Sequence, residues 1–242
     1  MYKKVDVLTS RFLPTVSRRA NSPLVHTQTM TIFDDFSAPI GTQGNALLNW
    51  RDDSSSEIIA YAAAYRSAAM NLTAIKEDQG VQAIDEAALP ILFLYRHSFE
   101  LYLKSLVYRA ATLSINENEL VHALPRLWRE HSLVRLVKMS EPILHDSCAR
   151  AFTRSGELLK NIGELAQRLE KIDPGSYAFR YPLTTKGAST LPSHFITNIF
   201  VFSEAMESVL DDLAQFCRRI EKERIETSDQ MKLALHELNR AT

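Results

Sequence analysis

The stretch that decides the fold runs from Ile91 to Tyr108 and has the sequence ILFLYRHSFELYLKSLVY. On a helix that turns by about 100° per residue, Arg96, His97, Glu100 and Lys104 fall on one stripe about 100° wide. The rest of the helix surface carries Ile, Leu, Phe, Val and Tyr. A helix that is apolar over most of its circumference is buried on most sides. The stretch therefore predicts the central helix of a helical protein.

The charged stripe on this helix has more than one interpretation. Unpaired charge is costly to bury, so on a central helix the stripe faces either a water-filled cleft or a network of partner groups. A ladder of alternating sign at positions i, i+4 and i+8 is also common on a solvated helix face. The stretch alone does not decide among these.

The remainder of the chain also favours long helices. Of 242 residues, only 7 are glycine and 9 are proline, whereas a sandwich or barrel needs a turn about every 8 to 12 residues. Helix-forming patterns, with capping residues before several of them, cover residues 52–78, 85–113, 124–139, 142–172, 193–226 and 227–240. The fourth pattern can break near Gly156. We predict an all-α bundle of about five long helices.

Two segments do not fit the helical pattern. Residues 1–50 are predicted to form an irregular N-terminal extension, with one or two short strands and a basic first part, beside a helical domain over 51–242. The sequence Asp173-Pro-Gly-Ser176 is a turn signal, so a short loop or hairpin insertion is expected near 174–192.

Composition excludes several classes of function. The formal charge of −1 gives the chain as a whole no strong affinity for nucleic acid. The scattered glycines form no dinucleotide- or phosphate-binding loop, and the seven histidines form no metal-binding pattern, so neither cofactor nor metal is expected. Two cysteines favour a reducing compartment. With no signal peptide and no apolar run long enough for a bilayer, we expect a cytoplasmic protein without membrane contact.

Three motifs in order carry a resemblance to a known family. They are Arg96-His97-x-x-Glu100-x-x-x-Lys104, then His122-Ala-Leu-Pro-Arg-Leu-Trp128, then Ile172-Asp-Pro-Gly-Ser-Tyr-Ala-Phe-Arg-Tyr-Pro182. Together, over residues 85–190, they resemble a group of bacterial HEPN-like helical proteins. The resemblance implies an antiparallel helical bundle that often dimerises. The wider superfamily includes metal-independent endoribonucleases of toxin and antiviral systems, and also noncatalytic members.

The resemblance also implies candidate catalytic residues. Catalytic members carry an Arg followed a few residues later by a His, near the start of a helix. Arg126 and His131 match that spacing, although on one ideal helix they would lie about 140° apart.

His97, with Arg96 and Glu100, is the competing catalytic set. Its alternative is a structural network that ties the second helix to the Arg180-Tyr181-Pro182 loop. Substrate binding is expected from Lys104, His122, Arg180 and Tyr181, although His122 could instead cap its helix or pack under Trp128. Trp128 itself is expected in the core or an interface.

The chemistry expected of such a site is simple. A histidine takes the proton of a ribose 2′-hydroxyl, and an arginine holds the phosphate, so RNA would be cut and DNA would not. A symmetric dimer would supply both an acid and a base.

The leading hypothesis is therefore a metal-independent endoribonuclease of a bacterial defence or toxin–antitoxin system. The alternative is a noncatalytic helical module of a larger defence complex that binds a nucleotide or a protein. In a third hypothesis, the helices mainly form a homodimer or larger complex, with the acidic segment from Glu204 to Thr242 as a docking element.

Overall fold

A computed structural model of the chain describes residues 43, 46, 54–77, 81–114, 124–151 and 155–222. The chain divides into two compact units, Met1–Leu47 and Leu48–Thr242, and the helices described here belong to the second. The predicted N-terminal extension lies almost entirely outside the described residues, and the predicted terminal helix up to Arg240 lies wholly outside them.

The second unit is helical, as predicted. The described residues contain no strand, only one isolated antiparallel bridge between Leu183 and Ser189 in the loop after α5. Nor do they contain a helix with the length and hydrophobicity that a membrane span requires. Five long helices and one short helical turn make up the bundle: α1 (Ser54–Glu77), α2 (Val81–Ser114), the turn over residues 124–129, α4 (Leu133–Ala151), α5 (Ser155–Ile172) and α6 (Ile199–Lys222).

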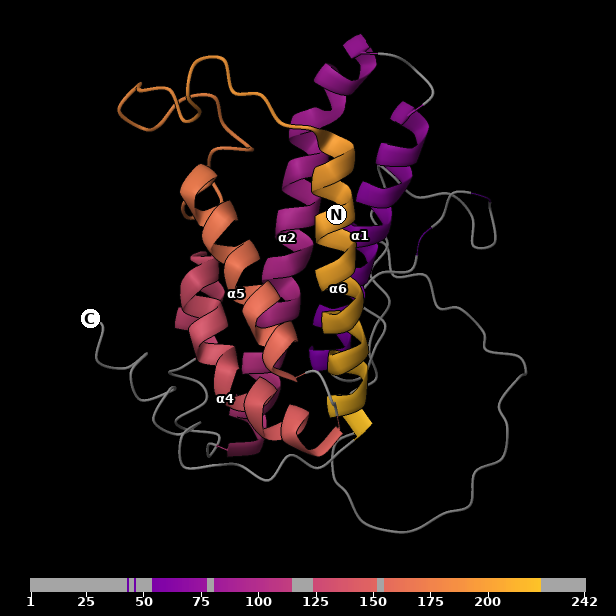
Figure 1. Cartoon of the computed structure of the whole chain (residues 1–242). Helices are drawn as coiled ribbons and strands as arrows, with labels where there is room; N and C mark the ends of the chain where they lie inside the picture. Colours follow the sequence, from indigo (N-terminus) through magenta and orange to yellow (C-terminus); the bar gives the residue numbers. More distant parts are fainter. Residues whose placement is uncertain are drawn as a thin grey trace, which may run out of the picture. The chain divides into compact units, whose positions relative to one another are not determined.

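The predicted central helix is α2. It packs against α1, α4 and α6, while α4 packs on α5 and α5 contacts α6 (Figure 1). The cause lies in its sequence, since apolar side chains on several sides of α2 are buried, among them Ile91, Tyr95, Phe99, Leu103 and Leu106. Because α2 is covered on several sides, its polar stripe must find partners inside the bundle.

The predicted helix over 124–139 is wrong. The helical turn ends at residue 129, residues 130–132 are not helical, and α4 begins at Leu133 and continues through Pro142. The new start is capped: Ser132 Oγ accepts from the backbone N of Arg135 at 3.4 Å, and Glu170 Oε2 accepts from the backbone N of Leu133 at 2.8 Å. As a result His131 lies in a connector between two helical segments.

The last helix also starts later than predicted, at Ile199. Asn198 caps it, because its Oδ1 accepts from the backbone N of both Phe200 and Val201 at 3.0 Å. Residues 173–198 thus form an irregular loop between α5 and α6. The predicted turn at its start is confirmed, with left-handed φ values of 72° at Gly175 and 62° at Ser176.

The apolar face of α6 is used within the bundle. Met206, Leu210, Leu213 and Cys217 are all buried there. An ion pair between Arg66 of α1 and Glu207 fastens the same helix on its polar side. The predicted helix–helix packing of this segment is therefore satisfied inside one chain.

The central position of α2 makes a testable prediction about stability. Phe99 is fully buried, so Phe99→Ala should lower the free energy of unfolding by about 3–5 kcal/mol through lost burial and a cavity. Val134, which is 40% exposed on α4, provides the control, since Val134→Ala should change it by no more than about 0.5 kcal/mol. Urea denaturation followed by circular dichroism measures both. Equal effects of the two substitutions would contradict the central placement of α2.

Candidate functional site

A buried polar network surrounds Glu100 of α2. Arg96 Nη1 donates to Glu100 Oε2 at 2.9 Å, and Lys104 Nζ donates to Oε1 at 2.8 Å. His131 Nδ1 lies 2.9 Å from the same Oε1. Arg96 is 0%, Glu100 1% and Lys104 3% exposed. The charged stripe therefore faces a network of partner groups, and its interpretation as a solvated ladder is wrong.

The donors left over on the two cations bind backbone carbonyls. Lys104 Nζ donates to Trp128 O at 3.1 Å, and Arg96 Nη2 donates to His131 O at 2.9 Å and to Asp173 O at 3.3 Å. Arg96 Nε also lies 3.0 Å from Asp173 Oδ2, an ion pair whose alignment is too poor for a hydrogen bond. These bonds hold both the segment before α4 and the start of the loop after α5 against α2.

Asp173 also fixes the backbone of the loop that follows it. Its buried carboxylate accepts from the backbone N of Tyr177 at 2.6 Å and of Ala178 at 2.5 Å. Further along the loop, Arg180 Nε donates to Ser176 O at 2.7 Å. The first part of the loop is therefore fixed by the same network that holds Glu100.

Glu100 is held in its ionised form. Burial by itself raises the pKa of this carboxyl, but Lys104 and then Arg96, with the hydrogen bond from His131, outweigh burial and lower the pKa below its usual value of 4.5. An ionised carboxylate can only accept hydrogen bonds. Nδ1 of His131 is therefore the donor in this hydrogen bond, which in the neutral tautomer leaves the lone pair on Nε2.

His131 is the member of the network that reaches the surface. Its side chain is 44% exposed, and no described residue hydrogen-bonds its Nε2. Arg126 lies on the helical turn that ends at residue 129, two residues before His131, so the expectation that it shares one helix with His131 is wrong. The pair thus consists of a basic residue on a short turn and an imidazole in the connector after it.

His97 lies apart from the hydrogen bonds of this network. Its ring stacks on Phe93 at a centroid distance of 5.4 Å and meets the edge of Tyr65 at 4.5 Å. Burial lowers its pKa, and the cations of the stripe add to that effect against the opposing pull of Glu100. His97 is accordingly a neutral ring in an aromatic cluster, and the structure does not bring it into hydrogen-bond contact with Arg96 or Glu100.

The predicted Arg180-Tyr181-Pro182 loop lies close to α2 by another route. The Arg180 guanidinium sits over the rings of Phe93, at 5.8 Å, and of Tyr181, at 5.5 Å. Arg180 is exposed, and Tyr181 is 48% exposed. The buried network itself reaches the loop at Asp173, earlier than the predicted residues. His122, also expected to bind substrate, lies outside the described residues.

Two contributors were not predicted as site residues. Asp173 was interpreted as part of a turn and of the third motif but not as a site residue, although a buried arginine on α2 needs an acidic partner beyond Glu100. Trp128 enters through its backbone carbonyl, which no side-chain pattern can indicate. The residue is 38% exposed, so Trp128 is not a core residue.

The network makes a prediction about acid stability. Glu100→Gln leaves two buried cations without their carboxylate and should lower the free energy of unfolding by about 3–5 kcal/mol at neutral pH. Because the folded-state pKa of Glu100 is lowered, its contribution is complete above its unfolded pKa of 4.5 and is lost as the pH falls through the folded-state value. The difference between wild type and Glu100→Gln should therefore shrink between about pH 5 and pH 3.

Urea titrations at a series of pH values measure this difference. The matched control is Glu164→Gln, because Glu164 is 49% exposed and its nearest Lys160 nitrogen is 3.8 Å away. Its substitution should cost no more than about 1 kcal/mol at any pH. A pH-independent gap between wild type and Glu100→Gln would contradict a depressed carboxyl pKa.

Among the described residues, no group of three or more His, Cys, Asp or Glu side chains could hold a metal ion. No family model matches this chain, and no similar curated protein or solved structure was found. The function is therefore argued from the Glu100–His131 pair and its surroundings.

Proposed function

We propose that this chain is a HEPN-like, metal-independent endoribonuclease in which His131 is the general base and Glu100 orients it. One observation carries the proposal. A hydrogen bond of 2.9 Å joins the carboxylate of Glu100, whose side chain is 1% exposed, to the imidazole of His131, whose side chain is 44% exposed. A buried carboxylate that fixes one ring nitrogen and leaves the other facing outward is the arrangement that prepares a histidine for proton transfer.

The reaction needs few groups. Nε2 of His131 takes the proton of a ribose 2′-hydroxyl as the 2′-oxygen attacks the adjacent phosphorus. The bond from phosphorus to the 5′-oxygen breaks, and that oxygen takes a proton from water or from the imidazolium of a second copy in a symmetric dimer. The products are a 2′,3′-cyclic phosphate and a 5′-hydroxyl. Glu100 stabilises the imidazolium that forms on His131.

The charge around His131 supports a phosphate substrate. Residues 124–138 carry four basic side chains and one acidic one, although the whole chain has a net charge of −1. Arg126 and Arg129 lie on the turn directly before the connector, and Arg129 is exposed. Arginine keeps its charge at any working pH and binds phosphate through two parallel hydrogen bonds. In the proposed reaction these arginines would offset the negative charge that develops at phosphorus.

The resemblance to HEPN-like proteins points in the same direction. It implies catalysis by Arg126 and His131, and the hydrogen bond between Glu100 and His131 supports His131 rather than His97 as the base. The setting that follows from the resemblance is a bacterial defence or toxin–antitoxin system, in which the enzyme acts as a homodimer or as part of a larger complex.

A noncatalytic binding module is the second candidate, and one observation favours it. Arg96 and Lys104 are buried and bonded to Glu100 and to backbone carbonyls, so neither is available to a substrate. The network would then serve only to shape a surface for a nucleotide or a protein.

RNA cleavage in EDTA tests the proposal. Wild type should cut RNA, and His131→Ala should lower the rate by about 10²–10⁴-fold because the general base is lost. An RNA with a 2′-deoxy sugar at the cleaved position should stay intact, since the nucleophile is missing. His97→Gln should retain cleavage.

His194 provides the matched control. It is an exposed histidine with a left-handed φ of 59°, a backbone that asparagine also accepts, so His194→Asn should leave cleavage unchanged. Absence of cleavage on every RNA tried, or cleavage that survives His131→Ala, would refute the proposed enzyme and favour the binding module.

A further inference from the structure

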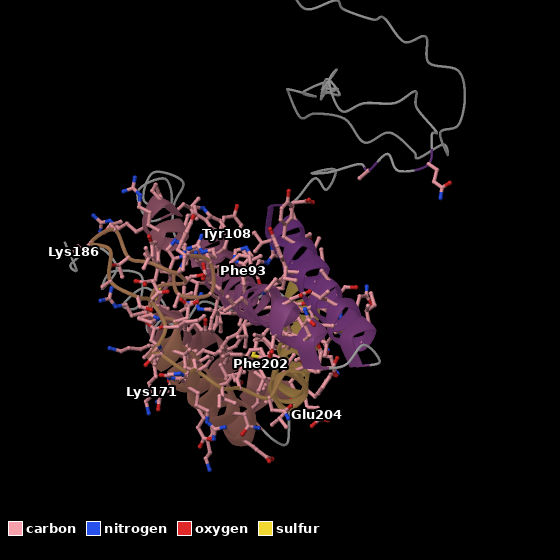
Figure 2. The ribbon with its side chains drawn as sticks, turned by 90° about the horizontal axis from the view of Figure 1, so that it is seen from above. Phe93, Tyr108, Lys171, Lys186, Phe202 and Glu204 are labelled. Atoms are coloured by element: carbon pink, nitrogen blue, oxygen red, sulfur yellow. The ribbon has the colours of Figure 1, made fainter. Side chains whose placement is uncertain are left out.

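Three residues on one face of α2 each have a neighbouring side chain from another segment of the chain. Phe93, Glu100 and Tyr108 lie within about 80° of each other around the helix. Seen from above, Phe93 and Tyr108 point to the same side of the bundle, whereas Phe202 lies on the side of α6 (Figure 2). From the rise of about 1.5 Å per residue of an α-helix, Glu100 lies about 10 Å from Phe93 and about 12 Å from Tyr108 along the axis of α2.

Each of these three positions on α2 holds a partly exposed side chain from another segment. Arg180 lies at Phe93, and its guanidinium is also over the ring of Tyr181, which is thus linked to Phe93 through Arg180. His131 lies at Glu100. Trp128 lies at Tyr108, with the ring centroids 6.0 Å apart. The exposed imidazole thus has an exposed aromatic ring on either side of it along the axis of α2.

Both aromatic residues are held in place from below. Lys104 fixes the backbone of Trp128 through its carbonyl, and Asp173 fixes the turn that leads to Tyr181. Even so, the Trp128 residue is 38% and the Tyr181 residue 48% exposed. Because the buried network already anchors the backbone of these residues, little conformational entropy is lost when a second ring stacks on the exposed ring.

We propose that Trp128 and Tyr181 are stacking sites for unpaired bases of an RNA strand, on either side of the phosphate that lies at His131. This inference rests on the proposed function, which supplies the phosphate. The spacing of about 10–12 Å along α2 between Glu100 and the positions of Phe93 and Tyr108 corresponds to about three nucleotides at the rise of about 3.4 Å of a stacked strand. Aromatic side chains bind bases of a single strand in this way with little dependence on sequence.

The charges nearby fit the same strand. The Arg180 guanidinium lies over Phe93 and over Tyr181 and adds a cation at one end, while Arg129, which follows Trp128 in the sequence and is exposed, adds one at the other. Only unpaired bases can offer their flat faces to such rings, because in a duplex both faces are stacked on neighbouring pairs. The surface therefore selects a single strand through its shape and charge.

Binding by a protein that cannot cut separates this inference from catalysis. In a His131→Ala background, fluorescence anisotropy with a short, unstructured, fluorescein-labelled RNA gives Kd. Trp128→Leu and Tyr181→Leu should each raise Kd by about 5- to 150-fold, because the stacking of one base is lost. Trp128→Phe and Tyr181→Phe should restore most of the affinity, since a ring remains. Val201→Ala, at a residue 62% exposed on α6, should leave Kd unchanged.

The same titration with other nucleic acids sharpens the test. Single-stranded DNA of the same sequence should bind within a few-fold of RNA, because stacking does not involve the 2′-hydroxyl, whereas a duplex RNA should bind much more weakly. The stacking sites are refuted if the Leu variants bind as tightly as their Phe counterparts, or if the duplex binds as well as the single strand.

The outcomes also distinguish the two proposals. Cleavage that depends on His131, combined with a Kd that does not depend on the rings of Trp128 and Tyr181, would refute the stacking sites and support the proposed enzyme. A Kd that depends on both rings, in a wild-type protein that cuts no RNA, would support the stacking sites and overturn the enzyme.

Discussion

The carboxylate of Glu100, sealed inside the bundle between two cations, is the interaction on which the rest of the structure depends. A single buried charge is very costly, and a pair is tolerated only when the remaining donors also find partners. Arg96 and Lys104 have more donors than one carboxylate can accept. Their surplus is met by the carbonyls of Trp128, His131 and Asp173. The need to satisfy two buried cations therefore determines where two irregular segments of the chain lie.

Much of the helical architecture could be predicted from the sequence. The apolar circumference of the stretch from Ile91 to Tyr108 placed α2 at the centre, because that pattern fits only a helix covered on several sides. The break before α4 was missed, although Ser132 is a good capping residue, because the apolar period continues across it from Leu127 to Leu136. Asn198 was missed as the cap of α6 for a similar reason: several polar residues before it are equally suitable, and only tertiary packing selects one.

The site was predictable in its acidic and basic members and not in its connections. Spacing on one helix shows that Arg96, Glu100 and Lys104 share a face, and the cost of buried charge shows that the face needs partners. It does not show which backbone carbonyls supply them, since every residue has one. The sequence likewise could not show which histidine contacts Glu100, because that depends on the fold, which brings the ring of His131 within 2.9 Å of the carboxylate.

The hydrogen bonds from Arg96 and Lys104 to backbone carbonyls restrict how this sequence can change in evolution. Losing Glu100 leaves two buried cations without their carboxylate, and losing Arg96 or Lys104 leaves buried carbonyls without their donors, as does replacing all three. The three positions can therefore hardly drift one at a time. Descendants of this sequence should either keep all three residues or exchange them together with a rebuilt connector before α4 and a rebuilt loop after α5. The trio should then be inherited as a block, even in lineages where the surface side chains around His131 have diverged.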